Sequence, residues 1–348
     1  MSDLLSTLEI VELGPDEVAR LREWAAVTAQ SARHELGDDA TAWAAEEIIA
    51  IAQEQSRRRK PGFHAAILDG EVVATGWVSL PLLDNLDSAE VDVHVRPDLR
   101  RRGIGTRLLE HVESVARAAG RSRFDSETCW PYAGPADGAG TPGAAFARKH
   151  GYGFGLVDVQ RALAVPVDEA LLAELAAEAA PRHADYRIES WHGPIPDPWV
   201  ESWLTLANTL NSEAPTGDME REDDAGDVAA QREAEESQAR QGRTSWQTVA
   251  LVGDEVVAYT EVVLPTHDQR FAYQWGTLVH RDHRGHRLGM AVKVANLQAM
   301  QRGADVRGRR VVTWNAEVND HMIGINERLG FVPVARGAEL QKKPARDR

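Results

Sequence analysis

The stretch from Val91 to Gly120, VDVHVRPDLRRRGIGTRLLEHVESVARAAG, decides how the first half of this chain folds. Residues 91–95 alternate valine with polar residues, which is the two-residue period of a β-strand, and Pro97 ends that strand. Gly103 and Gly105 then precede a segment in which apolar residues recur at helical spacing. Glycines at a helix start let backbone N–H groups approach a ligand closely, and a helix N-terminus favours an anion. The sequence therefore predicts a strand, a phosphate-binding turn and a helix.

Length and composition indicate two globular domains. The chain has 348 residues, 43% of them hydrophobic, and a domain usually takes about 100–200 residues. No apolar run approaches the roughly 20 residues of a membrane span, and the start, MSDLLSTLEIVELG, lacks the basic residues of a signal peptide. The sequence has one cysteine, Cys129, which excludes an internal disulfide framework. We expect a soluble cytoplasmic protein.

The charge of the chain narrows the class of partner. Its formal net charge is −15, whereas a surface that binds nucleic acid needs clustered positive charge. A negative field suits a cationic amine. Many cytoplasmic proteins are acidic, however, so the charge alone does not predict the partner. We expect no nucleic acid as partner and, because no apolar run could span a bilayer, no membrane. No metal site is expected.

An internal repeat divides the chain into two copies of one α/β unit. DGEVVA at 69–74 returns as GDEVVA at 253–258, an offset of 184 positions. The same offset relates the two glycine turns, since it carries Gly105 onto Gly289. Further on the offset falls to 179, so the first copy holds five extra residues, which we place in the loop 130–143. A fixed period of this kind indicates a tandem architecture.

We place the domain boundaries by this repeat. The first domain covers 1–165, a linker with a short helix covers 166–185, and the second domain covers 186–348. The acidic stretch 213–240 is interpreted either as a solvated loop and helix or as a wall of the binding site of one half. The charged tail after Gly337 is expected to fray.

The motif Arg100-x-x-Gly103-x-Gly105, after a strand that ends at Val95, resembles the acetyl-coenzyme A (acetyl-CoA) signature of the GCN5-related N-acetyltransferase (GNAT) superfamily. The repeat resembles tandem members of the actinobacterial type, such as mycothiol synthase. The resemblance implies an α/β protein of two GNAT-fold domains, each a mixed, mostly antiparallel sheet splayed at its fourth and fifth strands and flanked by helices. Acetyl-CoA would occupy the gap, and an amine would attack directly in a ternary complex, without a covalent enzyme intermediate.

The resemblance also assigns cofactor-binding residues in both copies. In the first copy they are Val93, His94, Val95, Arg100, Arg101, Arg102, Gly103, Ile104, Gly105 and Thr106. In the second copy they are Leu278, Val279, Arg284, Gly285, His286, Arg287, Leu288, Gly289, Asn319 and Asn326. The side chains of the first three arginines are expected to add charge near the phosphates.

The first copy carries two acids on its fourth strand. Glu90 and Asp92 are two positions apart and therefore point to one face, and the family often places its general base on this strand. Glu90 is our first candidate for the base, although both are explained equally well as solvent-facing strand acids. The tyrosine that commonly serves as general acid is replaced by Ala147. Ser126 and Cys129 lie on the fifth strand and could reach the thiolate region, although a small buried residue explains Cys129 better.

The second copy departs from the pattern in other ways. Arg287 stands where the signature has its first glycine, and a right-handed residue there still leaves backbone amides free for phosphate. Gln274 occupies the Glu90 position, so the base is missing. Glu317 at the end of the fifth strand and Asn319 before the last helix are the catalytic candidates of this copy. Asn326 takes the tyrosine position, and a carboxamide cannot act as a general acid near neutral pH.

The sequence favours an acetyl-CoA-dependent N-acetyltransferase that modifies a primary amine of a small molecule. Two alternatives stay open: an acyl-CoA-binding regulatory module without turnover, and a protein N-acetyltransferase. The resemblance to tandem members would make the second half catalytic, whereas the residues lean slightly to the first half. The chain is expected to be a monomer with pseudo-dimeric halves or a homodimer.

Overall fold

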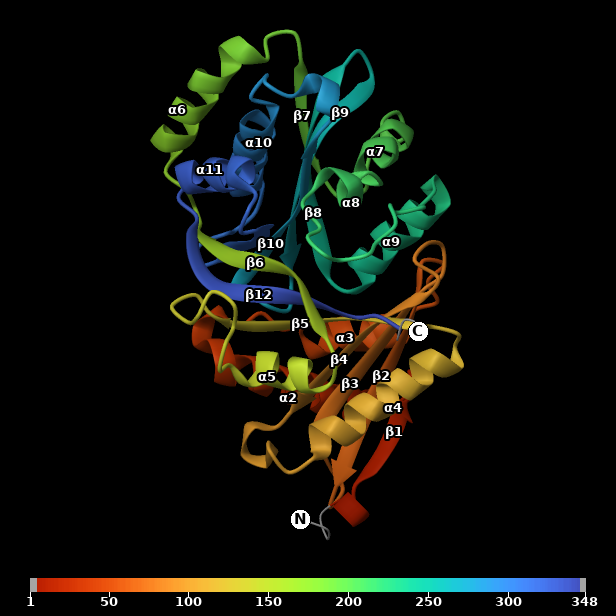
Figure 1. Ribbon diagram of the computed structural model, residues 1–348. Coiled ribbons are helices and arrows are strands. Elements are labelled where there is room, and N and C mark those ends of the chain that lie inside the picture. The colour runs from red at the N-terminus through yellow and green to blue at the C-terminus, as the bar shows by residue number, and fades with distance from the viewer. Residues whose placement is uncertain (1–4, 345–348) are drawn as a thin grey trace. The chain divides into compact units, whose positions relative to one another are not determined.

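The computed structural model describes residues 5–344 and shows an α/β protein with two compact units (Figure 1). Unit 1 contains the described residues 5–158, 216–221 and 335–344, and unit 2 contains 159–215 and 222–334. Each unit has a mixed sheet with helices packed against it. No helix in 5–344 combines the length and the hydrophobicity needed to cross a bilayer.

The sheet of unit 1 has the strand order β1-β2-β3-β4-β5-β12, followed by the first half of β6. β1 to β4 pair antiparallel, β5 is parallel to β4, and β12 is antiparallel to β5. The strands are β1 (Glu9–Leu13), β2 (Arg59–Leu68), β3 (Glu71–Pro81), β4 (Ser88–Val95), β5 (Arg123–Pro131), β6 (Gly153–Ala164) and β12 (Val332–Lys342). The helices are α2 (Val18–Leu36), α3 (Ala45–Ala52), α4 (Ile104–Ala118) and α5 (Pro142–Lys149).

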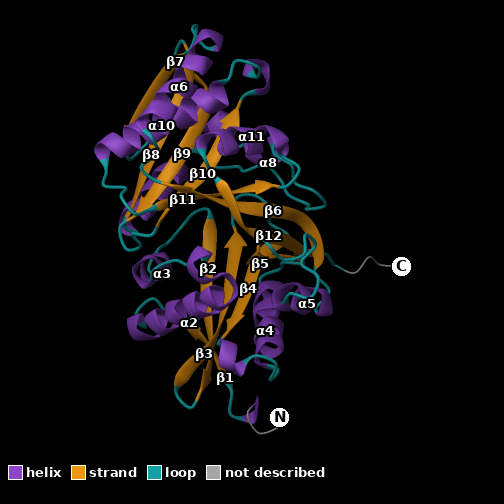
Figure 2. Ribbon diagram, turned by 90° about the vertical axis from the view of Figure 1, so that its left-hand side faces the viewer, coloured by secondary structure: helices purple, strands orange, loops and turns teal. Residues whose placement is uncertain are grey.

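The two faces of this sheet have different cores. In Figure 2, α2 and α3 lie on one side of the strands, and α4 and α5 lie on the other. On the α2 side, Trp24 packs edge-on against Phe63, which packs against Trp77. On the α4 side, Gly76 lets the helix approach closely, since an added Cβ would meet Val112 at 2.8 Å. Each residue of β4 therefore faces one of two helical layers, according to its parity.

Unit 2 repeats the arrangement with the strand order β6-β11-β10-β9-β8-β7. Its further strands are β7 (Arg187–His192), β8 (Arg243–Val252), β9 (Glu255–Pro265), β10 (Phe271–Val279) and β11 (Arg310–Ala316). Its helices are α6 (Glu169–Ala179), α7 (Val200–Ala207), α8 (Leu210–Glu213), α9 (Val228–Arg240), α10 (Leu288–Gly303) and α11 (Asp320–Leu329). Helix α6 lies in the stretch expected to link the copies, and its Leu172 and Leu175 are buried in the α10 core.

The last strands of the two copies are exchanged. β12 ends the second copy in sequence, yet it lies beside β5 in unit 1, and β6 ends the first copy, yet it lies beside β11 in unit 2. The expectation that the tail frays after Gly337 is wrong, because 335–342 pair continuously with 124–131. Backbone pairing along the open edge of β5 holds this segment in place.

Candidate functional site

The turn between β4 and α4 forms a cradle of backbone N–H groups in unit 1. Arg101 and Gly103 adopt left-handed conformations with φ of 64° and 91°, and α4 begins at Ile104 without a side chain that caps it. The N–H groups of a first helical turn have no acceptor within the helix. Together with the helix dipole they favour an anion such as phosphate.

The arginines of this turn divide into two groups. Arg101 and Arg102 are exposed, and neither forms an ion pair with any carboxylate of the described chain. Arg100 turns inward instead, where it pairs with Glu35 and donates to Ser31 Oγ at 3.0 Å. Arg100 therefore ties the turn to α2, and the free charge at the cradle comes from Arg101 and Arg102.

The resemblance also assigned other residues to cofactor binding, and several of these pack beneath the backbone of the cradle. At Gly105 an added Cβ would meet Val95 at 3.3 Å and Phe146 at 3.5 Å, so this glycine permits close packing of the helix on the strand. Ile104 is buried, Val93 packs against the same core, and Thr106 Oγ1 lies 3.1 Å from His150 Nε2. Burial and the charge of Arg100 lower the pKa of His94 to about 4, so this histidine is neutral at pH 7.

β4 and β5 separate beyond the cradle. They pair in parallel over only three residue pairs, Ser88–Glu90 with Arg123–Asp125, although both strands continue further. β10 and β11 behave alike, with pairs only between 271–273 and 310–312. Both units thus have the expected splay between their fourth and fifth strands.

The second cradle has the same backbone but a different pattern of glycines. Its left-handed residues are Gly285, with φ of 85°, and Arg287, with φ of 54°, which fall 184 positions after Arg101 and Gly103. The expectation of a right-handed Arg287 is therefore wrong. A left-handed non-glycine residue costs roughly 1–2 kcal/mol, and the turn keeps its shape in spite of that cost.

Carboxylates of unit 2 already hold the arginines of the second cradle. Arg281 and Arg284 both pair with Glu213 of α8, and Arg287 pairs with Glu178 of α6, which also holds Arg328. These arginines lower the pKa of Glu178 to about 2. His286 Nδ1 lies 3.1 Å from the carbonyl oxygen of Arg182. The positive charge of this cradle is thus partly neutralised from within the unit, since each of the two carboxylates pairs with two arginines.

A bulge in β10 changes the match between the two fourth strands. Gln274 pairs with Val262, the counterpart of Val78, and the register then shifts before Thr277. In unit 1, Val78 pairs with Val91, whereas Glu90 pairs with Ser79. The structure therefore corrects the match of Gln274 to Glu90, since a bulge inserts one residue and reverses the faces. The residue in the Glu90 position is Tyr273, and Gln274 is buried, where its Nε2 donates to the carbonyl of Glu261 at 2.7 Å.

The remaining candidates of the second copy serve the fold. Asn319 caps α11, with its Oδ1 accepting from the N–H of Met322 at 3.2 Å. Asn326 is completely buried and donates from Nδ2 to Asn315 Oδ1 at 2.7 Å. Gly289 faces Ile325 as Gly105 faces Phe146. Leu278 and Leu288 are buried core residues, Val279 packs against the Leu288 core, and Glu317 is exposed just beyond β11.

The first copy, in contrast, assembles acids from four strands on one face of its sheet. Glu90 is the register partner of Asp125, and Glu127 is the register partner of Glu339. Paired residues on neighbouring strands point to the same face, and here that is the α2 side. We call this set the carboxylate row: Glu90, Asp92, Asp125, Glu127, Asp158 and Glu339.

Burial and mutual repulsion raise the pKa of several members of the row. Burial raises the pKa of Asp92 to about 6, although Ser126 Oγ–H at 2.7 Å and the Glu127 N–H at 3.3 Å donate to it. The side chain of Glu127 reaches solvent, yet the surrounding sheet removes much of its hydration. This desolvation, followed by the charges of Asp92 and Glu90, raises its pKa to about 8. Burial and the adjacent Glu339 raise the pKa of Asp158 to about 7.

Two arginines pair with members of the row. Arg59 pairs with Glu90, and Arg221 pairs with Glu339. Among residues 5–344, no cation forms an ion pair with Asp92, Glu127 or Asp158. These three acids of the row therefore have no cation paired directly with them.

Arg221 reaches the row from the acidic stretch of the second copy. Its segment, 216–221, belongs to unit 1 and is fixed by backbone contacts. The Asp218 N–H donates to Gly155 O at 2.8 Å, and the Glu220 N–H donates to Gln341 Oε1 at 3.0 Å. This part of the stretch is a packed segment beside the row, whereas α9 is an ordinary helix of unit 2.

Sequence reasoning missed Glu127, Asp125, Asp158 and Glu339. The alternation Asp125-x-Glu127 was visible as one acidic face of a strand, but Glu339 joins it only through the exchanged strand. Cys129, the fifth-strand candidate for the thiolate region, has its pKa raised by burial and by Glu127, so it is a neutral thiol. Ala147, which replaces the tyrosine, is buried on α5.

Comparisons with known proteins agree with this geometry. Residues 19–129 match the model of the acetyltransferase (GNAT) family. Over 98% of this chain and 100% of the other, the fold resembles a tandem GNAT protein from the clavulanic acid biosynthesis pathway, solved without acetyl-CoA, with 25% identity and a TM-score of 0.77.

Two less similar structures share the fold. A GCN5-related N-acetyltransferase from Sphaerobacter thermophilus is 14% identical over 97% of this chain and 96% of its own, with a TM-score of 0.62. A glucosamine N-acetyltransferase region of a fungal multi-domain β-N-acetylglucosaminidase is also 14% identical, over 96% of this chain and 38% of that one, with a TM-score of 0.58. A search of curated proteins finds no match.

Proposed function

Because the chain is a tandem protein of the GNAT superfamily, we propose that its unit 1 is an acetyl-CoA-dependent N-acetyltransferase acting on a primary amine of a small molecule. Members of the superfamily are acyltransferases, and the proposal narrows this to one unit, one cofactor and one class of acceptor. The observation that carries it is the carboxylate row, which lies where β4 and β5 separate, in the unit whose cradle keeps two arginines free.

The first cradle fits acetyl-CoA better than the second. The N–H groups at the start of α4 would hold the pyrophosphate, and Arg101 and Arg102 would balance its charge. In unit 2 the same anion would have to displace Glu213 and Glu178 from the arginines. Bound acetyl-CoA would supply an acetyl thioester.

The carboxylate row supplies what an amine acceptor needs. An alkyl ammonium group is attracted to Asp92 and Glu127, with which no cation of the described chain forms an ion pair. It must lose a proton before it can attack, and a base works best when its pKa is close to the operating pH. Glu127 reaches solvent and has a pKa raised to about 8, whereas Glu90 is held by Arg59. We therefore assign proton removal to Glu127, with Asp92 as the adjacent carboxylate.

The test compares matched glycine variants of the two cradles. A tryptophan at Gly105 would collide with Val95 and Phe146, and a tryptophan at Gly289 would collide with Ile325. Calorimetry should show that Gly105→Trp loses acetyl-CoA binding and that Gly289→Trp retains it. Loss of binding in the second variant alone would move the proposal to unit 2.

Turnover separates the enzyme from a binding module. Release of free thiol from acetyl-CoA should accelerate with at least one member of a panel of small amines, and Gly105→Trp should abolish the acceleration. Tight binding of acetyl-CoA without thiol release across the panel would favour the module without turnover. Acetylation of peptides but not of small amines would favour a protein N-acetyltransferase.

A further inference from the structure

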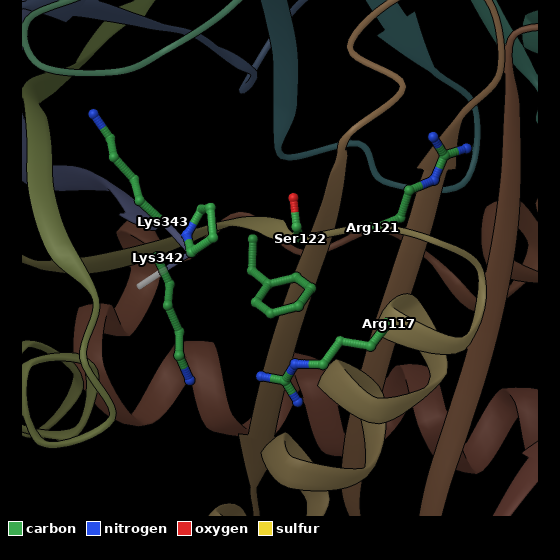
Figure 3. A pocket seen from close by; sticks show the side chains of 7 residues that line it. Arg117, Arg121, Ser122, Lys342 and Lys343 are labelled. Carbon is green, nitrogen blue, oxygen red and sulfur yellow. The ribbon is translucent and has the colours of Figure 1, made fainter. Parts of the chain in front are cut away.

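A second concave site lies at the far end of α4 from the cradle. It has a volume of about 270 Å³ and lies between the C-terminal end of α4, the start of β5 and the residues that follow β12 (Figure 3). Helix α4 has 15 residues, so the site is roughly 22 Å along the helix from the cradle. The residues of α4 and β12 that line it lie on the sheet face opposite the carboxylate row.

The lining gathers positive charge in a chain of net charge −15. Four of the seven lining residues are basic: Arg117, Arg121, Lys342 and Lys343. Figure 3 shows the ends of Arg117 and Lys342 on one side of the site and the ends of Arg121 and Lys343 on the other. A concentration of this kind favours an anionic ligand.

Internal partners leave part of this charge available. Glu113 is buried and accepts from Lys342 Nζ at 2.8 Å, from Arg117 Nη2 at 2.5 Å and from Tyr152 Oη at 2.9 Å. Its single charge cannot balance both cations. Arg121 donates from Nη2 only to the carbonyl of Pro81, at 2.8 Å, and its buried Nε has no acceptor among the described residues. A buried donor without a partner calls for a ligand or a water.

The floor of the site is apolar. Phe124 and Pro344 line it, and the Arg117 guanidinium lies over the Phe124 ring at 4.9 Å from the centroid. Ser122 adds one hydroxyl group at the rim. Apolar walls with a few convergent charges are the usual lining of a small-molecule site. The volume limits the ligand to a small molecule.

We propose that this site binds a small organic anion, with its apolar part beside Phe124 and Pro344 and its anionic group attracted by the basic residues that line the site. The site is independent of the cradle and of the acyl-transfer proposal. Because Lys342 belongs to β12, the bound anion also stabilises the strand that carries Glu339.

The probe is phenyl phosphate. Two controls separate its parts: inorganic phosphate has the charge without the ring, and benzyl alcohol has the ring without the charge. Ligand-observed NMR should show binding of phenyl phosphate that exceeds both. Arg117→Gln and Arg121→Gln should each weaken it roughly tenfold, since a hydrogen bond to a charged group is of this strength. Arg307→Gln removes an equally positive but exposed side chain of unit 2 and serves as the matched control.

A thermal-shift series completes the test. Phenyl phosphate should raise the melting temperature of the full chain and of Arg307→Gln, but not of Arg117→Gln. Binding that persists unchanged in both pocket variants would overturn the proposal, because it would locate the anion elsewhere, such as in the cradle. Equal affinity for inorganic phosphate would overturn the organic part of the ligand class.

Discussion

The two cradles of this chain have one backbone and two electrostatic states. Both turns place left-handed residues at equivalent positions, at 101 and 103 in unit 1 and at 285 and 287 in unit 2. In the first, Arg101 and Arg102 lack carboxylate partners, whereas in the second Arg281, Arg284 and Arg287 are held by Glu213 and Glu178. The difference teaches that a phosphate-binding turn is defined by its shape together with the partners of its charges.

The two units also differ in where their acidic residues lie. Unit 1 gathers a carboxylate row on its sheet, while the equivalent position of Glu90 in unit 2 is Tyr273. In unit 2, the carboxylates of Glu178 and Glu213 instead pair with the arginines of its own cradle. A cradle with unpaired arginines and an acidic surface thus occur in the same unit, which is the arrangement that the proposed acyl transfer to an amine needs.

The largest expected effect comes from removing the exchanged strand. A chain ending at Val334 lacks residues 335–342, so β5 loses its antiparallel partner and the buried Glu113 loses Lys342. Glu113 keeps Arg117 and Tyr152 as partners, so most of the effect comes from the lost strand pairing. Unit 1 should lose cooperative unfolding in calorimetry, while unit 2 keeps its own transition. A chain ending at Pro344 is the control, and retention of both transitions in the shorter chain would contradict the assignment of β12 to unit 1.

The next largest effect is expected at Glu127, the proposed general base. Glu127→Gln should lower kcat by about 10²–10⁴, the usual contribution of a general base, with little change in acetyl-CoA affinity. The wild-type rate should increase as the pH rises from 6 to 8, because Asp92 and Glu127, with pKa values near 6 and 8, must be ionised. Tyr273→Phe, at the equivalent position of Glu90, should leave the rate unchanged. An unaltered pH profile in Glu127→Gln would remove this residue from the mechanism.

A smaller effect should appear when the ion pairs of the second cradle are removed. Replacing Glu178 and Glu213 by glutamine frees Arg281, Arg284 and Arg287 of the second cradle, together with Arg328. Calorimetry on a Gly105→Trp background should then detect weak acetyl-CoA binding that this background alone lacks, a gain of several-fold per carboxylate. No gain would mean that the shape of the second cradle, rather than its ion pairs, excludes the anion.

The smallest effect is on stability as a function of pH. The pKa of Asp158 is raised to about 7 in the folded protein by burial and by Glu339, against about 3.9 in an unfolded chain. The folded state therefore holds this proton more tightly, and stability is lost as the pH rises through about 7. Asp158→Asn should reduce the fall in melting temperature between pH 5 and pH 8 by a few degrees. An identical fall in melting temperature in the wild type and in Asp158→Asn would contradict the raised pKa of Asp158.

The sequence predicted the repeat and the cradle, because each has a local pattern of period, glycine and charge, and the resemblance to the GNAT superfamily predicted the splayed sheets. It could not predict the bulge in β10, since an offset of 184 positions cannot reveal which residue of a strand is unpaired. It also missed Glu339 as a member of the carboxylate row. That residue reaches Glu127 only through strand pairing between segments some 200 positions apart, and no local pattern specifies such a partner.

The exchanged strand also determines the order in which the two units can be completed while the chain is synthesised. β5 ends at Pro131 and its neighbour β12 begins at Val332, so 200 residues separate them. At the usual rate of about 5–20 residues per second, β5 waits roughly 10–40 s on the ribosome for its native partner. Unit 1, although encoded first, is therefore completed only after residue 342 has been made.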